Sequence, residues 1–240
     1  MMRRIGRFVL RAGAACAAAA LSGTVALAQG CADVALVLAV DGSSSVDDGE
    51  YRLQQQAISA ALRNADVLDA MEAAGSVAVA VVFWGDPDRP TEQTEPVVIE
   101  GAEDAERLAR VVERLPRLVF GNTGLNTGLQ AAIDRLDAMG CAHRRVINVS
   151  GDGRGTILSR LRRPYPRLEA VRAQAEAAGI TINALTISNE EEDLAEYYRT
   201  RVITGDGAFV MDVDTHADYA AALRRKLIRE IAPIVVGSAE

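Results

Sequence analysis

The sequence predicts an α/β fold in which one open, mainly parallel sheet lies between helices on both faces. Short runs of β-branched and small apolar residues, with few polar positions, are typical of strands buried on both sides. They alternate with longer stretches whose apolar residues recur at helical spacing. Strands that alternate with helices become parallel neighbours joined by crossovers. No internal repeat or low-complexity linker divides the chain, so we expect a single domain.

The elements follow from these two patterns. The expected strands are residues 33–40, 76–84, 145–150 and 180–187. The expected helices are residues 51–65, 102–115, 124–139, 168–179 and 219–235. Their apolar stripes are Leu53, Ala57, Ala60 and Ala61; Leu108, Val111, Val112 and Leu115; Leu125, Leu129, Ala132, Ile133 and Leu136; and Leu223, Leu227 and Ile231.

Residues 1–28 are expected to be a secretory signal peptide, which leaves residues 29–240 as the domain. Four arginines precede an alanine-rich apolar stretch that ends in Ala26-Leu27-Ala28, the order of such a signal. A membrane anchor is the alternative, but the stretch is short of the ~20 residues that span a bilayer. No later segment is long and apolar enough to do so. We therefore expect a periplasmic or secreted protein.

The net charge of the mature chain indicates which classes of ligand it can bind. Without the four signal arginines, the net charge falls from −7 to −11, which disfavours nucleic acid and favours cations or basic partners.

Two cysteines, Cys31 and Cys141, remain after the signal peptide, and a pair in an oxidising compartment is expected to form a disulfide. They meet only if the strands that follow them are parallel neighbours. A lipidated Cys31 is the alternative, although Ala28-Gln29-Gly30 suits a lipoprotein signal poorly.

Open parallel sheets bind ligands at the carboxyl ends of their strands, so residues just after each strand are informative. Those residues are 41–45, 84–86, 150–156 and 188–192, and the segment 121–128 before a helix joins them. A nucleophilic hydrolase lacks its base, because neither His143 nor His216 follows an expected strand. An aspartyl phosphatase needs an acid where Ser43 stands, and a dinucleotide loop needs glycine where Thr156 stands. Neither the histidines nor the cysteines have zinc-ligand spacing.

A divalent cation held by oxygen fits the remaining pattern. The candidate ligands are Asp41, Ser43, Ser45, Thr123 and Asp152. Mg²⁺ takes about six oxygens and keeps several waters, so few protein groups suffice. Mn²⁺ is equally suitable and Ca²⁺ is not excluded. Taken singly, Ser45 and Thr123 could each cap a helix and Asp152 could belong to a turn. Their joint occurrence at strand ends favours the metal site.

These residues resemble a known family. "DGSSS" after an apolar strand resembles the D-x-S-x-S signature of von Willebrand factor type A (VWA) domains, "GNTGLNTGL" resembles their threonine-bearing segment, and "VINVSGDG" resembles the strand ending in an acidic-glycine pair. The resemblance is closer still to exported bacterial proteins of unknown function built on this domain. It covers nearly the whole mature chain. Ser150-Gly151 departs from the wider family, in which leucine and threonine often precede the acid.

The resemblance implies a Rossmann-like sheet with a metal-ion-dependent adhesion site, to which the five residues above contribute. It also implies that the strands after Cys31 and Cys141 are neighbours, which would join the two cysteines. A protein partner with an acidic side chain would complete the metal shell. Thr127 resembles the motif threonine almost as well as Thr123, which is preferred because Thr127 falls within the expected helix.

Three functions remain to be compared. The first is a non-enzymatic module that binds proteins through the cation. The second is a metal-assisted hydrolase, whose base would be Asp86, Glu190, Glu191 or Glu192. The third is a scaffold with an empty site. The lack of a nucleophile beside a base favours the first.

Overall fold

A computed structural model describes residues 31–156 and 164–233. The expected signal peptide, residues 1–28, lies outside these residues. The strands are β1 Ala32–Asp41, β2 Val77–Trp84, β3 Glu92–Gln93, β4 Val97–Ile99, β5 Ala142–Gly151, β6 Ile180–Ile187 and β7 Val210–Val213. The helices are α1 Asp48–Leu62, α2 Ala65–Ala74, α3 Ala102–Arg114, α4 Leu125–Ala138, α5 Leu168–Ala177, α6 Leu194–Arg201, the short 3₁₀ turn His216–Asp218, and α7 Tyr219–Ile231.

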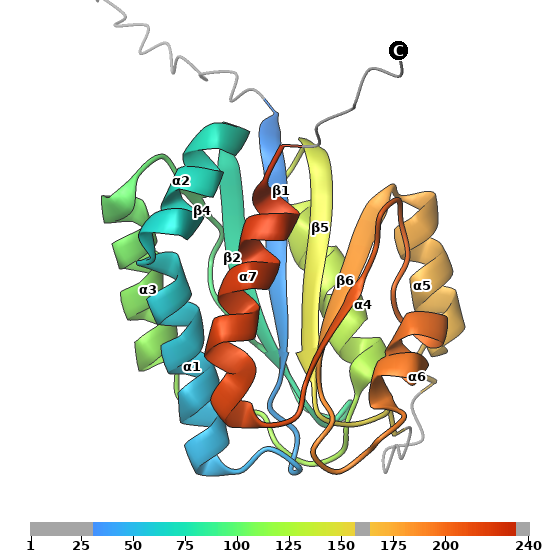
Figure 1. The fold of residues 1–240 in the computed structure, drawn as a ribbon. Coiled ribbons are helices and arrows are strands. Elements are labelled where there is room, and N and C mark those ends of the chain that lie inside the picture. Colours follow the sequence, from blue (N-terminus) through green and yellow to red (C-terminus); the bar gives the residue numbers. More distant parts are fainter. Residues whose placement is uncertain (1–30, 157–163, 234–240) are drawn as a thin grey trace, which may run out of the picture.

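The strands form one mainly parallel sheet, as predicted, and their order is β3-β2-β1-β5-β6-β7 (Figure 1). β1 is central and pairs in parallel with β2 and β5, β6 joins β5, and β7 joins β6. The short strands β3 and β4 run antiparallel to β2 along its outer side. The parallel strands therefore end at one edge, the lower edge in Figure 1.

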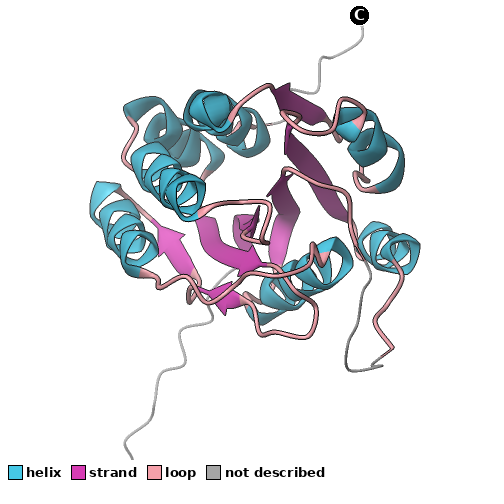
Figure 2. Cartoon of the chain, turned by 90° about the horizontal axis from the view of Figure 1, so that it is seen from below, coloured by secondary structure: helices cyan, strands magenta, loops and turns pink. Residues whose placement is uncertain are grey.

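Alternate residues of each central strand supply two separate hydrophobic cores. On one face, Leu36 and Leu38 of β1 pack with residues of α1, α2, α3 and α7. On the other face, Val37 and Ala39 pack with residues of α4, α5 and α6. A view along the sheet shows helices on both sides of it (Figure 2). The three-layer arrangement follows from strands that are apolar at nearly every position.

The predicted stripes of α4 and α7 are buried as expected, but those of α1 and α3 are partly wrong. Leu53 and Val111 are 47% and 46% exposed, and Ala60 is exposed as well. Polar side chains share the buried face of α1 with apolar ones such as Ile58 and Leu62. Gln55 Nε2 donates to the carbonyls of Val112 and Leu115 at 3.0 and 2.9 Å, and Ser59 Oγ donates to that of Ala109 at 3.1 Å. These bonds let α1 and α3 pack closely through polar groups.

A disulfide joins Cys31 and Cys141, whose Cα atoms are 4.8 Å apart. It lies where β1 and β5 begin, because Ala32 pairs with Ala142 in the parallel register. The predicted link is thus present, and it uses the thiol that lipidation of Cys31 would need. The disulfide therefore links β1 and β5 at the amino-terminal edge of the sheet, opposite to the edge where the parallel strands end.

Among the described residues, no helix is both long and apolar enough to cross a membrane.

Candidate functional site

The candidate site begins where β1 ends. Asp41 is the last residue of β1 and is fully buried, and the backbone N–H of Ser43 donates to its Oδ1 at 2.8 Å. This bond folds the chain sharply back after the strand. Gly42 makes the turn possible, because a Cβ there would lie 2.6 Å from Val119 Cγ2. The turn brings the hydroxyls of Ser43 and Ser45 to the same side.

All five predicted ligands belong to one connected cluster. Ser43 Oγ and Ser45 Oγ are 3.1 Å apart, and Ser45 Oγ donates to Asp152 Oδ1 at 2.7 Å. Thr123 Oγ1 donates to Ser43 Oγ at 3.3 Å. Three loops, following β1, preceding α4 and following β5, therefore place their oxygens together at the carboxyl edge. Among the described residues there is no group of three or more His, Cys, Asp or Glu suited to a metal, and this cluster combines two carboxylates with three hydroxyls.

Ser45 and Thr123, which could each have been helix caps, do not cap a helix in the structure. Asp47, not Ser45, caps α1, because its Oδ1 accepts from the N–H groups of Gly49 and Glu50. Gly124 is the N-cap of α4 and has no side-chain cap bond, so Thr123 does not cap that helix. Ser45 and Thr123 are thus free to face the cluster.

The hydroxyls of the two candidate threonines, Thr123 and Thr127, have different partners in the structure. Thr127 lies within α4 and its hydroxyl donates to the carbonyl of Gly124 at 2.8 Å, a bond inside its own helix turn. Thr123 instead reaches the cluster from a loop held in place by backbone bonds. Its N–H donates to Thr156 Oγ1 at 3.0 Å, and its carbonyl accepts from the N–H of Thr156 at 2.8 Å.

The electrostatics of the cluster are unfavourable without a cation. Oδ2 of Asp41 is buried and has no hydrogen-bond partner among the described residues. Burial, and then the negative charge of Asp152, raise the pKa of Asp41 to about 8. Burial also raises the pKa of Asp152, against the lowering effect of the Ser45 bond. An unpartnered buried carboxylate is costly, and a bound cation would satisfy it.

Arg117, which sequence reasoning missed, holds the first loop from outside. Its Nη2 donates to the carbonyls of Ser43 at 3.2 Å and Val46 at 2.6 Å, and its Nη1 donates to Asp48 Oδ1 at 2.7 Å. Backbone carbonyls as acceptors leave no mark in the sequence around residues 41–48, so no local pattern could have revealed this residue. The guanidinium connects the loop that carries Thr123 to the loop that carries the serines.

His216 also lies at this edge, contrary to the expectation that neither histidine follows a strand. The four-residue strand β7, absent from the sequence prediction, ends three positions before it. His216 is 8% exposed, its Nδ1 lies 3.1 Å from Glu50 Oε1, and its Nε2 has no partner among the described residues. It thus joins β7 to the first turn of α1.

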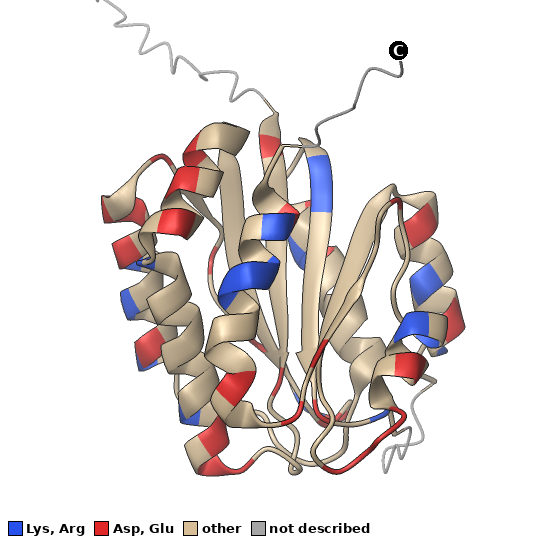
Figure 3. Cartoon of the chain, viewed as in Figure 1, with Lys and Arg blue, Asp and Glu red and all other residues tan. Residues whose placement is uncertain are grey.

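The acidic residues considered as hydrolase bases are engaged in part. Asp86 Oδ2 accepts from the backbone N–H and the side-chain amide of Asn122, at 3.3 and 2.9 Å. Glu191 pairs with Arg154 at 2.9 Å. Glu190 and Glu192 are exposed. Figure 3 shows that acidic residues recur along the loops of the lower edge.

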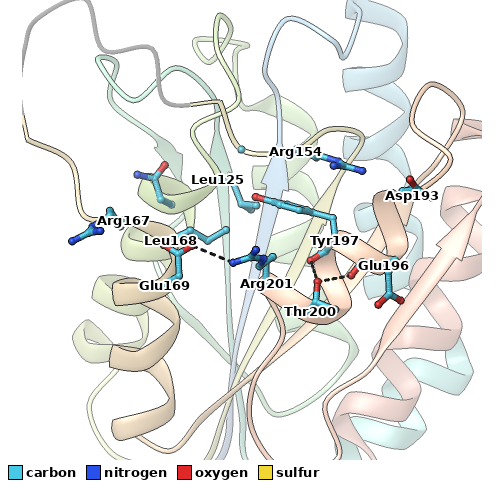
Figure 4. Close-up of a pocket in the computed structure, with 12 residues that line it drawn as sticks. Leu125, Arg154, Arg167, Leu168, Glu169, Asp193, Glu196, Tyr197, Thr200 and Arg201 are labelled. Atoms are coloured by element: carbon cyan, nitrogen blue, oxygen red, sulfur yellow. Dashed lines mark hydrogen bonds and ion pairs between the residues drawn. The ribbon is translucent and has the colours of Figure 1, made fainter.

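A cavity of about 740 Å³ adjoins the cluster, between the starts of α4 and α5 and the side of α6 (Figure 4). Leu125, Leu168 and Tyr197 provide apolar surface, and Arg154 and Arg201 are among its charged residues. Its lining includes Leu125, two residues after Thr123, and Arg154, two residues after Asp152, so both loops of the cluster continue into its wall.

Solved structures similar to this fold include von Willebrand factor type A domains. The pilus adhesin SpaC of Lactobacillus rhamnosus GG aligns with a TM-score of 0.60 and 15% identity, over 85% of this chain and 31% of SpaC. The vWF domain of the type V pili tip protein Mfa5 from Porphyromonas gingivalis gives 0.58 and 15%, over 87% and 99%. Proximal thread matrix protein 1 from the mussel byssus, with a zinc-occupied MIDAS motif, gives 0.57 and 14%, over 82% and 47%.

These likenesses establish a VWA-type fold, while the chain spans less than a third of the length of the adhesin SpaC. More specifically, the chain belongs to the family described as "Protein of unknown function (DUF1194)", whose model matches residues 30–235. The sequence resemblance to VWA domains is thereby confirmed. No curated protein matches the chain.

Proposed function

We propose that the protein is an exported, non-enzymatic binding module that holds a divalent cation at the cluster and uses it to capture an acidic side chain of a protein partner. The unpartnered Oδ2 of Asp41, beside a connected set of hydroxyls, carries this proposal. The cluster offers oxygen ligands alone, which suits Mg²⁺ or Mn²⁺. Two carboxylates leave a divalent ion with room for an anionic ligand from outside.

The residues would divide the work as follows. Ser43 and Ser45 would supply hydroxyl ligands, with Thr123 binding directly or through water. Asp41 and Asp152 would act mainly through water and supply the negative charge. The adhesins among the solved structures with this fold support a role in protein binding, and the disulfide supports export.

Isothermal titration of the purified protein with Mg²⁺ and with Mn²⁺ tests the metal site. The double variant Asp41→Ala with Ser43→Ala should bind neither ion. Ser44→Ala is the matched control, because Ser44 lies between two proposed ligands while its Oγ accepts from the N–H of Gly121 at 2.8 Å. The control should bind both ions with nearly normal affinity. Equal heats for the wild type and the double variant would refute the proposal.

A second measurement tests capture of the partner. Proteins retained by the immobilised protein in Mg²⁺ should be released by a chelator, and the double variant should not retain them. Retention that is insensitive to both changes would assign partner binding to another surface.

A further inference from the structure

The loop before Thr123 presents two apolar side chains outward beside the cluster. Along residues 115–124, Val119 is only 1% exposed, whereas Leu118 and Phe120 are 57% and 42% exposed. The alternation is that of an extended segment with one side facing the core. Large apolar side chains held in water beside a candidate ligand site are typical of a binding surface.

The backbone around Phe120 is fixed rather than free to turn inward. The N–H of Asp86 donates to the carbonyl of Phe120 at 3.0 Å. The next residue, Gly121, exchanges two bonds with Ser44: its carbonyl accepts from Ser44 N–H at 2.9 Å, and its N–H donates to Ser44 Oγ at 2.8 Å. The apolar loop is therefore joined directly to the loop of the serine ligands.

Two arginines lie beside these apolar side chains. The guanidinium of Arg89 lies 3.8 Å from the centre of the Phe120 ring, and a shallow depression of about 660 Å³ links Phe120 to Arg52 and Ser44. Neither Arg89 nor Arg52 forms an ion pair within the described ranges. Three nearby acids have partners. Asp47 caps α1, Asp48 pairs with Arg117, and Glu92 Oε2 accepts from the N–H of Leu118 at 3.2 Å.

We infer that the partner's metal-binding carboxylate carries an aromatic or large aliphatic group close beside it, which packs on Leu118 and Phe120. We name Leu118, Phe120, Arg52 and Arg89 the Phe120 surface. This inference rests on the proposed function and specifies the partner's chemistry. A rigid apolar surface next to a charged anchor provides a desolvated contact around the polar one. The two free guanidiniums attract further acidic groups of the same segment.

Small carboxylates serve as probes for this surface. Acetate provides the carboxylate alone, whereas 3-phenylpropanoate and 5-phenylpentanoate add a ring at increasing distance. ¹H–¹⁵N NMR titrations of the purified protein in saturating Mg²⁺ should give a dissociation constant for each. We expect at least one phenyl compound to bind about tenfold more tightly than acetate, since part of the ring leaves water. Its shifts should include Phe120 and Gly121.

The double variant Leu118→Ser with Phe120→Ser should reduce that ratio to below twofold and leave acetate binding unchanged. Val98→Ser is the matched control: Val98 is 46% exposed and pairs with Ala78 near the start of β2, at the opposite edge. The control should retain the tenfold ratio. Neutralising Arg52 and Arg89 with glutamine should weaken the phenyl compounds at low salt and have little effect at high salt.

Two different failures are distinguishable. If all three compounds bind in Mg²⁺ with equal affinity, the inference about the Phe120 surface is wrong and the proposed metal-dependent capture stands. If none shows chelator-sensitive binding, the proposed function fails, and the inference fails with it.

Discussion

The hydroxyl of Ser45 donates a 2.7 Å hydrogen bond to Oδ1 of Asp152, 107 positions further along the chain. Ser45 follows β1 and Asp152 follows β5, and these neighbouring strands bring the two residues together. Burial raises the pKa of Asp152 and this bond opposes the rise, whereas Oδ2 of Asp41 has no hydrogen-bond partner among the described residues. Asp152 therefore has a hydroxyl donor from a neighbouring loop, whereas Asp41 keeps one carboxylate oxygen without a partner among the described residues, so the cost of burying a carboxylate without a cation falls chiefly on Asp41.

Asp41→Asn should remove a pH-dependent weakness of the metal-free protein. Because the folded pKa of Asp41 is raised from 3.8 to about 8, the folded state holds a proton that the unfolded state releases. The free energy of unfolding should thus fall as pH rises from about 4 to about 8. Thermal unfolding with a chelator at pH 5, 6.5 and 8 should show this loss in the wild type and less of it in the variant. Added Mg²⁺ should restore the wild type alone; identical pH profiles would contradict the prediction.

Arg117→Met should weaken both the fold and the metal site. The guanidinium donates to several carbonyls of the first loop, so its loss leaves buried acceptors unsatisfied, at a cost of roughly 1–3 kcal/mol. Metal affinity should fall several-fold as the serine loop loosens. Arg117→Lys should recover only part of both, because one ammonium cannot reach as many acceptors. Arg107→Met is the control, since Arg107 is exposed and pairs with the neighbouring Asp104 of α3. Normal metal affinity in Arg117→Met would limit Arg117 to a structural role.

Replacing both Cys31 and Cys141 by serine should lower stability without affecting metal binding. The disulfide closes a span of 110 residues, and removing such a link typically costs 2–5 kcal/mol. It lies at the edge of the sheet opposite to the cluster, so the ligand loops should stay in place. Denaturant unfolding measures the first effect and Mn²⁺ titration the second. Loss of Mn²⁺ binding by a still folded variant would be inconsistent with this view.

The buried pair Lys226–Glu230 should respond to paired substitution. Both side chains are fully buried, with Nζ 2.5 Å from Oε1, and Glu230 Oε2 accepts from Asn148 Nδ2 at 2.7 Å. Lys226→Met alone leaves an uncompensated carboxylate and should cost about 3–5 kcal/mol. Adding Glu230→Gln removes that charge while keeping an acceptor for Asn148. The double variant should therefore be more stable than Lys226→Met, as measured by urea unfolding. Additive losses would show that the two charges are not coupled.

The central strands were predictable because nearly every residue in them is apolar. β3 and β4 have two and three residues, too few for a periodic pattern, and they form only by pairing with the outer side of β2. The helices α2 and α6 and the strand β7 were not predicted either. The α1 stripe was only partly right: Ala57 and Ala61 are buried, but burial of Gln55 and Ser59 depends on carbonyls of α3, which only the packed structure supplies.

The candidate site shows the same division. Asp41, Ser43, Ser45, Thr123 and Asp152 were predictable as a group, because each stands at a loop that a parallel sheet brings to one edge. Arg117 and His216 were not. Arg117 acts on backbone atoms of a distant loop, and His216 follows a strand too short to recognise.

The position of the two ends of the described chain determines how the oxygen cluster is oriented when the protein is attached through either end. Cys31 directly precedes β1, and Arg144 near the start of β5 donates to the carbonyls of Ile231 and Ala232, so the described chain begins and ends at the same edge of the sheet (Figure 1). The oxygen cluster lies at the far edge. A fusion partner or tether at either end would therefore lie at the edge opposite to the cluster. The cluster of an immobilised protein would then face the solution and be accessible to its ligand.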